Sequence, residues 1–285
     1  MTRSTVEIRQ IFYDAATRAA VRPGFLPLDN TAGRQDWFEF WPILQFLRTH
    51  PLDPDTWYGF VSPKFPDKTG MDWPRMQALL VASPDAEVAL FSPFWTSLAV
   101  CQNPWLQGER DHPGLVAAME GFLRRRGDTT RLADVVTDFD CSVNSNYFIA
   151  RAAFWREWQL LAEAYLAHVE GAEAAELPDG RITSYDPREG VALKVFVQER
   201  LVNWVLLQRR FPVVRPDYEA EGPLATFYDR RWARWLYGRC DDAKRAAARG
   251  RGRALWLGVF HMLRLTIAVL QWRYNRAALG ERSRR

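Results

Sequence analysis

Short apolar runs alternate with amphipathic helical segments over the first 155 residues, and this order constrains the fold more than any other feature of the chain. Runs with strand character lie at residues 6–14, 56–65, 86–94 and 146–150, and a segment with helical spacing separates each from the next. Strands and helices in alternation are typical of a sheet flanked by helices. The sequence therefore predicts an α/β fold, and apolar spacing over residues 191–208 adds one further helix.

The charge distribution divides the chain into two unequal parts. Residues 230–285 hold fifteen Lys and Arg against three acidic residues, which gives this segment a net charge of +12. The rest of the chain is then −8, because the whole carries +4. With 48% hydrophobic residues there is ample material for a core. We expect an α/β domain over residues 1–216 and a basic, aromatic, helical tail over residues 217–285.

The tail contains the longest apolar stretch of the chain, residues 254–270. His261 and Arg264 lie near its centre, which makes a bilayer-spanning helix costly. Such a helix packs in a bundle, forms a homodimer, or lies at a membrane interface with arginines reaching the headgroups. We expect residues 230–285 to bind an anionic membrane surface, with a domain-capping or dimer helix as the alternative. A nucleic-acid partner is not expected, because the acidic body repels phosphate.

The cysteines and the first residues bear on location. Three cysteines, widely spaced and without a CxxC pair, indicate neither a disulfide framework nor a zinc site. The first residues contain no apolar run of the signal-peptide type. The sequence thus predicts a cytoplasmic protein, peripheral to the inner face of the cell membrane.

Six segments between Ile8 and Trp204 follow one another in a distinctive order: FLPLDN, FEFW, WYGFVSPKF, AEVALFSP, NYFIARAAFW and ERLVNW. This order resembles that of the GT-A-type glycosyltransferases, and more narrowly of the exopolysaccharide-biosynthesis group found in bacterial capsule and lipopolysaccharide gene clusters. The resemblance implies a GT-A-like, Rossmann-like mixed sheet and a nucleotide-sugar donor. One segment departs from the family, whose basic H-Y-R-R is SPKF here and leaves Lys64 and Lys68 as cations.

The same resemblance implies substrate-binding roles for Glu39, Asn144, Asn146 and Glu199, besides the two lysines. Asn146 stands before the fourth predicted strand, where Tyr147 and Phe148 are expected to alternate between cleft and core. The alternatives are that the two asparagines satisfy loop backbone groups, and that Glu199 forms an ion pair on a helix surface.

Three further candidates follow from position along the chain. Asp14 ends the first strand, where open α/β sheets bind ligands, so a contact to the base or ribose is expected. Asp29 and Asn30 lie in the turn that we place nearby. A helix N-cap is the alternative for Asp14.

The triplet DFD places Asp138 and Asp140 two residues apart in an irregular segment, a spacing at which hard oxygen ligands converge on Mg²⁺ or Mn²⁺. In the alternative, Asp138 caps a turn and Asp140 is solvated. Asp138 is also a candidate catalytic residue. The other candidates for a general base are Glu109 and His112, in a polar segment that we predict to be a loop, although His112 also suits the start of the next helix.

Together these features predict a glycosyltransferase that moves a sugar from a nucleotide-diphosphate donor to a cell-surface polysaccharide or lipid-linked glycan. The alternative from another class is a non-catalytic scaffold, or a membrane-peripheral component, of a polysaccharide assembly complex.

Overall fold

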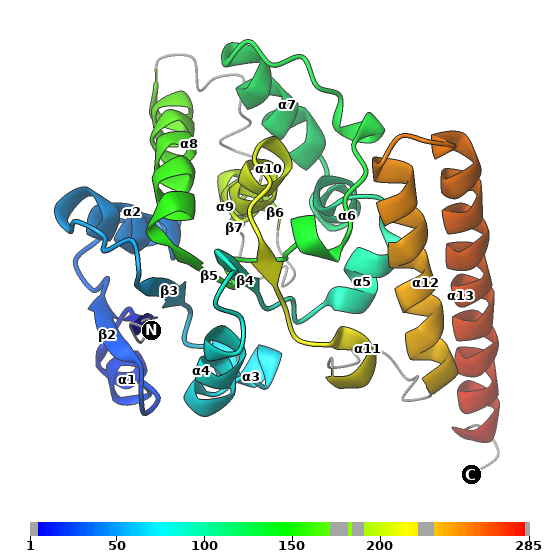
Figure 1. The fold of residues 1–285 in the computed structure, drawn as a ribbon, viewed down its shortest axis with the longest axis horizontal. Helices are drawn as coiled ribbons and strands as arrows, with labels where there is room; N and C mark the ends of the chain where they lie inside the picture. The colour runs from blue at the N-terminus through cyan, green and yellow to red at the C-terminus, as the bar shows by residue number, and fades with distance from the viewer. Residues whose placement is uncertain (1–4, 172–181, 184–190, 222–230, 283–285) are drawn as a thin grey trace.

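The computed structural model describes residues 5–171, 182–183, 191–221 and 231–282 (Figure 1). The strands are β1 (Val6–Phe12), β2 (Leu26–Asp29), β3 (Trp57–Val61), β4 (Val88–Leu90), β5 (Phe148–Arg151), β6 (Ile182–Thr183), β7 (Val191–Ala192) and β8 (Val213–Val214). The helices of the first half are α1 (Ala15–Ala19), α2 (Phe40–Thr49), α3 (Phe65–Thr69), α4 (Trp73–Val81), α5 (Trp95–Val100), α6 (Pro104–Asp111) and α7 (Leu115–Arg125). Those of the second half are α8 (Ala152–Glu170), α9 (Leu193–Gln198), α10 (Leu201–Gln208), α11 (Tyr218–Glu221), α12 (Arg231–Ala248) and α13 (Arg253–Arg282).

Six of the strands form one mixed sheet in the order β2-β1-β3-β5-β4-β8. Every pairing is parallel except those of β5, which runs antiparallel between β3 and β4. The sheet crosses the middle of the molecule, with α8, α9 and α10 on one side and α1, α3 and α4 on the other (Figure 1). The α/β class and the helix-flanked mixed sheet predicted from the sequence are confirmed.

Aromatic packing holds α8 on the sheet. The chain passes without a break from β5 into α8 at Ala152, as the sequence predicts. Trp155 is buried, stacks on Phe148 with ring centroids 4.9 Å apart, and donates its indole N–H to the Tyr58 carbonyl oxygen at 3.0 Å. A buried aromatic of this kind contributes about 3–5 kcal/mol by large-to-small substitution. At Gly59 of β3 the neighbours leave no room for a side chain, since an added Cβ would lie 2.8 Å from Ile149.

A second hydrophobic core joins the C-terminal helices to the body. It includes Trp95 of α5, Phe139, Tyr218 of α11, Tyr237 of α12 and Phe260 of α13. Trp95 and Tyr218 stack with ring centroids 5.9 Å apart. The helices α12 and α13 lie side by side at the edge of the molecule that carries the C-terminus (Figure 1). Within the predicted tail, the described helices α11, α12 and α13 therefore pack against α5 and Phe139 in this second core.

Two expectations about local structure are wrong. Residues 104–111, predicted as part of a loop, form α6, because Asn103 caps the helix by accepting from the Leu106 N–H at 2.8 Å and proline occupies the first helical position. Residues 191–208, predicted as one helix, form the short strand β7 followed by α9 and α10, with a break at Glu199 and Arg200. There the buried Arg200 guanidinium donates to the carbonyl oxygens of Phe196 at 2.6 Å and Pro104 at 2.9 Å.

Candidate functional site

A cleft of about 410 Å³ lies at the edge of the sheet where the parallel strands end. Tyr13 follows β1, Ser62 and Lys64 follow β3, and Ser145 precedes the antiparallel β5, so all four residues reach the same edge. The sheet continues from β1 to β2 on one side and to β3 on the other, so this edge is a topological switch point. Open α/β sheets bind their ligands at such points. We call this hollow the strand-edge cleft.

The strand-edge cleft brings together five of the residues singled out in the sequence. Glu39 stands at the N-terminus of α2, Lys64 and Lys68 at α3, Asn146 before β5, and Glu199 in the break between α9 and α10. Tyr147 also lines the cleft and Phe148 packs in the core, as the predicted alternation requires. Segments more than 150 residues apart in the sequence thus share one hollow.

Asn146 is a buried polar residue on the wall of the cleft. Its side chain is 4% exposed, and neither Oδ1 nor Nδ2 finds a hydrogen-bond partner among the described residues. A buried polar group left without a partner costs about 1–3 kcal/mol, and native proteins rarely retain one. The NH₂ group and the carbonyl oxygen of this amide therefore leave their hydrogen-bonding capacity unused at a residue that lines the cleft.

Backbone strain is concentrated at the same place. Of the non-glycine residues that the structure describes, Phe38 and Ser145 have positive φ, at 45° and 63°, and both line the strand-edge cleft. Such conformations cost about 1–3 kcal/mol each and cluster at ligand sites. Asn30, which lies behind the cleft rather than in it, donates its amide to the Phe38 carbonyl oxygen at 3.3 Å. The local sequence pattern does not predict the positive φ angles of these two residues.

The two glutamates of the cleft are both shifted toward the protonated form. Burial raises the pKa of Glu199 to about 7, with the Glu39 charge adding to the effect and with Arg200 and Lys68 opposing it. Burial likewise raises the pKa of Glu39, against the attraction of Lys68 and Lys64. A carboxyl group with a pKa near 7 exchanges protons readily at neutral pH, as a general acid or base must.

Lys64 and Lys68 supply positive charge at the mouth of the cleft. Both side chains are exposed, and neither forms an ion pair or hydrogen bond within the ranges of the chain that the structure describes. The Lys68 ammonium lies 5.9 Å from the centre of the Tyr147 ring and 6.0 Å from that of Phe94. Two cations beside a hollow, attracted by Glu39 and Glu199 but in direct ion-pair contact with neither, fit an anionic ligand such as a diphosphate.

A second hollow, of about 550 Å³, continues the first toward the C-terminal helices, and we call it the tail-side hollow. The two hollows share the residues Lys68, Ser145, Phe196 and Glu199. The far wall of the tail-side hollow is formed by Tyr237 of α12 and Gln271 of α13. The region around Glu199 is therefore accessible from both hollows.

Asp14, Asp29 and Asn144 lie outside both hollows. Asp14 is the N-cap of α1, where it accepts from the Thr17 N–H at 2.7 Å, which is the alternative weighed from the sequence. Asp29 accepts from the N–H and hydroxyl of Thr31 in a turn. Asn144 is buried, and its side-chain amide has no hydrogen-bond partner in the described part of the chain.

Glu109 and His112, predicted as candidate bases, serve the helix junction between α6 and α7. The Glu109 carboxylate accepts from the backbone N–H groups of Gly114 at 2.8 Å and Val116 at 2.7 Å, which caps the start of α7. His112 is 0% exposed and its ring stacks on Phe196 with centroids 3.4 Å apart. Burial and then Arg200 lower the pKa of His112 to about 4. Neither residue lines the two hollows.

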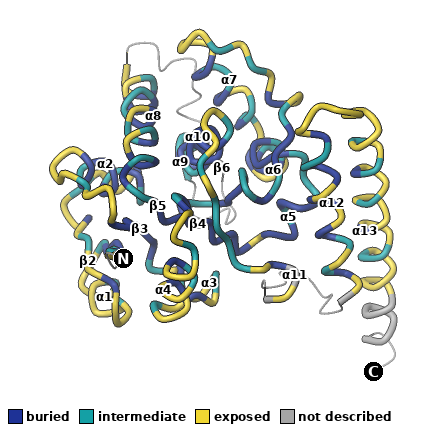
Figure 2. The backbone as a smooth tube through the Cα atoms, in the orientation of Figure 1, coloured by how far each residue is buried: buried dark blue, intermediate teal, exposed yellow. Residues whose placement is uncertain are grey.

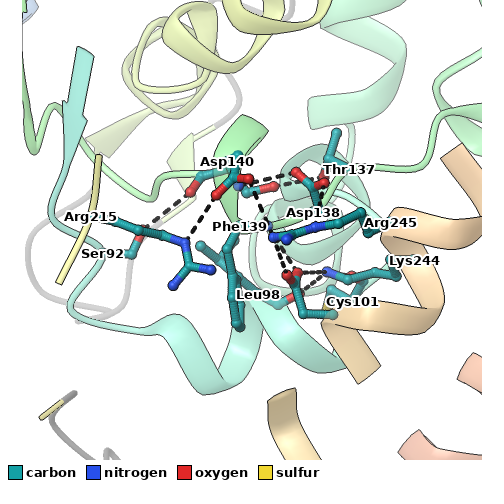
Figure 3. Close-up of polar contacts among 12 residues, drawn as sticks. Ser92, Leu98, Cys101, Thr137, Asp138, Phe139, Asp140, Arg215, Lys244 and Arg245 are labelled. Atoms are coloured by element: carbon teal, nitrogen blue, oxygen red, sulfur yellow. Dashed lines mark hydrogen bonds and ion pairs between the residues drawn. The ribbon is translucent and has the colours of Figure 1, made fainter. Parts of the chain in front are cut away.

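The DFD carboxylates lie in a charge cluster with Arg245 of α12 and with Arg215, which follows β8 (Figure 3). Arg245 bridges them, with its guanidinium 3.2 Å from Asp138 Oδ2 and 3.3 Å from Asp140 Oδ2. Arg215 binds Asp140 at 3.1 Å, and Asp138 also accepts from the Asp140 N–H at 3.0 Å. This donor set does not fit a divalent cation, because arginines already neutralise both carboxylates. Across the described residues no group of three His, Cys, Asp or Glu side chains is placed to hold a metal ion.

Comparison with protein-family models, curated proteins and solved structures finds no match to this chain. The interpretation of the strand-edge cleft therefore rests on its geometry, its unpaired polar groups and its charges.

Proposed function

We propose that the protein is a glycosyltransferase that binds a nucleotide-diphosphate sugar in the strand-edge cleft and passes the sugar to a glycan acceptor. The observation that carries the proposal is the buried Asn146 amide, which lacks a hydrogen-bond partner and belongs to a residue that lines the same cleft as two lysines without ion pairs, at the switch point of the sheet. A sugar presents hydroxyl groups that both donate and accept, and a diphosphate presents negative charge. One ligand of this class satisfies both features.

In this proposal Lys64 and Lys68 hold the diphosphate, and Asn146 hydrogen-bonds the sugar. Glu199 takes the proton of the acceptor hydroxyl while that oxygen bonds to the anomeric carbon. The bond from that carbon to the diphosphate oxygen breaks, and the nucleoside diphosphate leaves with the electron pair, its charge met by the two lysines. A base with a pKa of about 7 both accepts and releases the proton at neutral pH.

Thermal unfolding in the presence of UDP-, GDP-, CMP- and dTDP-linked sugars, each with and without Mn²⁺, tests the proposal. A ligand that binds the native state raises Tm, by an amount that grows with the ratio of its concentration to Kd. We expect one nucleotide class to raise Tm. We expect the double variant Lys64→Ala, Lys68→Ala to lose the shift.

Arg22→Ala is a matched control for the lysine variant, because it removes a positive charge close by but outside both hollows. Arg22 pairs with Asp67 at 2.8 Å, and both partners are largely exposed. The control is expected to keep the full Tm shift. No shift with any donor, or an equal loss in the control, would contradict the proposal.

The second candidate, a non-catalytic scaffold of a polysaccharide assembly complex, is favoured by one observation. The DFD carboxylates are held by arginines rather than arranged for a metal. The scaffold predicts that a donor binds without being turned over or hydrolysed. Measuring release of free nucleoside diphosphate from the donor that raises Tm separates the two functions.

A further inference from the structure

We infer that the tail-side hollow is the binding subsite for a lipid-borne acceptor, whose phosphate-bearing head lies near Lys68 and whose chain leads toward α13 and the bilayer. The inference rests on the proposed function. It selects the lipid-linked class of acceptor because of the residues that line the tail-side hollow. Three observations carry it.

The first observation is the continuity of the two hollows. Lys68, Ser145, Phe196 and Glu199 line both, so a group seated in the tail-side hollow reaches Glu199 from the side opposite the donor. A transferase needs this arrangement, because donor and acceptor must approach one reacting centre from different directions.

The second observation is the mixed chemistry of the walls. Apolar and aromatic side chains line one part, namely Phe94, Val100, Phe196 and Tyr237. Lys68 and Arg110 line the same hollow, and Arg110 pairs with the neighbouring Asp111 at 3.3 Å. The Ser97 hydroxyl on its wall is buried and has no hydrogen-bond partner in the described part of the chain. Apolar walls with a few polar groups and two cations match an amphipathic phosphate better than a free polysaccharide.

The third observation is the outer face of α13, a helix that forms one edge of the molecule (Figure 2) and borders the tail-side hollow through Gln271. Buried positions of α13 such as Phe260 and Ile267 face α12, whereas the following apolar residues are exposed: Leu255 at 69%, Met262 at 66%, Leu265 at 61%, Val269 at 50% and Trp272 at 56%. An 18-residue window within Arg253–Arg276 has a mean hydropathy of 1.5 and 11% of its residues buried, so this helix is apolar enough to cross a membrane by length and composition.

The bilayer is the occupant that this face fits. Residues 230–285 carry a net charge of +12, which an anionic leaflet attracts. In this inference the helix lies on the membrane and does not span it, because α12 lies along it and would bring the exposed Arg239 and Asp242 into hydrocarbon. With α13 lying in the interface, Gln271 on its inner side borders the tail-side hollow, so a lipid chain passes from the bilayer into the hollow beside it.

Calorimetric titration with decyl phosphate, kept below its micelle concentration, tests the subsite without knowledge of the natural acceptor. We expect the full-length protein to bind it at least tenfold more tightly than inorganic phosphate or decanol. Ser97→Phe fills the hollow from its α5 wall and Gln271→Trp narrows it from α13, and each is expected to weaken binding at least tenfold. Ser83→Phe introduces the same ring outside both hollows and is expected to leave the affinity unchanged.

Nucleotide-sugar binding by the same variants separates this inference from the proposed function. Ser97→Phe and Gln271→Trp are expected to keep the Tm shift caused by the donor, which also reports that they fold. If decyl phosphate binds no better than inorganic phosphate, or binds both filled variants as it binds the wild type, the subsite is excluded even when the donor binds. If the donor fails to bind while decyl phosphate behaves as expected, the proposed function fails and the amphiphile site stands.

Flotation with vesicles of phosphatidylglycerol and phosphatidylethanolamine tests the face of α13. Leu265→Glu is expected to reduce vesicle binding at least tenfold and to leave decyl phosphate binding intact, because Leu265 lies on the outer face. The contrary outcome is a wild type that sediments as a dimer and a variant that sediments as a monomer but floats with vesicles like the wild type. The exposed face of α13 is then a contact between two copies of the chain, and the inference that the acceptor lipid enters from the bilayer is wrong.

Discussion

The strand-edge cleft and the DFD charge cluster are both rich in polar residues, but they differ in whether those residues have partners. In the cluster every DFD carboxylate meets an arginine or a backbone N–H (Figure 3). In the cleft the Asn146 amide and both lysines lack hydrogen-bonding partners among the described residues, and the backbone is strained at Phe38 and Ser145. Polar groups whose hydrogen bonds are all made within the protein stabilise the fold, whereas unpaired polar groups in a cleft are free to bind a ligand.

The cluster also shows what its charges do for the fold. Asp241 is 3% exposed, accepts from the Phe139 N–H at 2.8 Å, and lies 3.9 Å from the fully buried Lys244. Lys244 in turn donates to the carbonyl oxygens of Leu98 and Cys101. These bonds tie α12 to α5 and to the segment that holds DFD. The acidic triplet is thus an anchor for the C-terminal helices.

Loss of Glu199 is expected to have the largest effect on activity. Glu199→Gln removes the base while it keeps the size of the side chain, so we expect the rate of sugar transfer to fall by about 10²–10⁴-fold. Binding of the nucleotide sugar is expected to persist in thermal shift. Glu109→Gln is the matched control, because Glu109 caps α7 outside both hollows, and its transfer rate should stay near that of the wild type. Equal losses of transfer rate in the two variants would show that Glu199 contributes to transfer no differently from a residue that only caps a helix.

Lys244→Met is expected to have the largest effect on stability. Removing one partner of a buried ion pair leaves the other uncompensated, so the free energy of unfolding in urea should fall by about 3–5 kcal/mol. Adding Asp241→Asn should recover part of that loss, because the unpaired charge disappears with it. A loss below about 1 kcal/mol would show that this pair does not anchor α12.

The pKa of Glu199 predicts a stability difference that depends on pH. Because burial raises this pKa from 4.5 to about 7, folding favours the protonated carboxyl, and its stabilising contribution is lost as pH rises through 7. Relative to Glu199→Gln, which stays neutral, the wild type should lose about 3 kcal/mol of unfolding free energy between pH 4 and pH 8. A pH-independent difference would show that Glu199 titrates normally.

Asn146→Leu is expected to separate stability from binding. Replacing an unsatisfied buried amide by an apolar group of similar size should raise the free energy of unfolding by about 1–2 kcal/mol, because no hydrogen bond is lost. The Tm shift caused by the nucleotide sugar should disappear in the same variant. A destabilised Asn146→Leu protein would indicate that the amide has a structural partner.

The sequence predicts the fold better than it predicts the site. Strand and helix order follow from periodicity, so β1, β3, β4, β5 and α8 lie where the apolar patterns place them. Glu39 and Asn146, which line the cleft, are singled out through the family resemblance and not through the apolar pattern.

Pattern alone does not tell a cap from a catalytic group. Glu109 and Asp14 have the residue types of a site, yet each is used by the helix that follows it, and only the positions of nearby N–H groups decide this. The break at Glu199 depends on Arg200 reaching the Pro104 carbonyl oxygen 96 residues away, a contact that no local pattern contains.

Asp140→Asn gives the smallest expected effect and is the most direct comparison of the two regions. Its ion pairs with Arg215 and Arg245 are partly exposed, so the free energy of unfolding should change by less than about 1 kcal/mol. Because Asp140 lies outside the strand-edge cleft, donor binding and the transfer rate should stay at wild-type values, with or without Mn²⁺. If the variant folds but loses Mn²⁺-dependent transfer, the DFD triplet is part of the active site. A carboxylate that only pairs with arginines would not change how transfer depends on Mn²⁺.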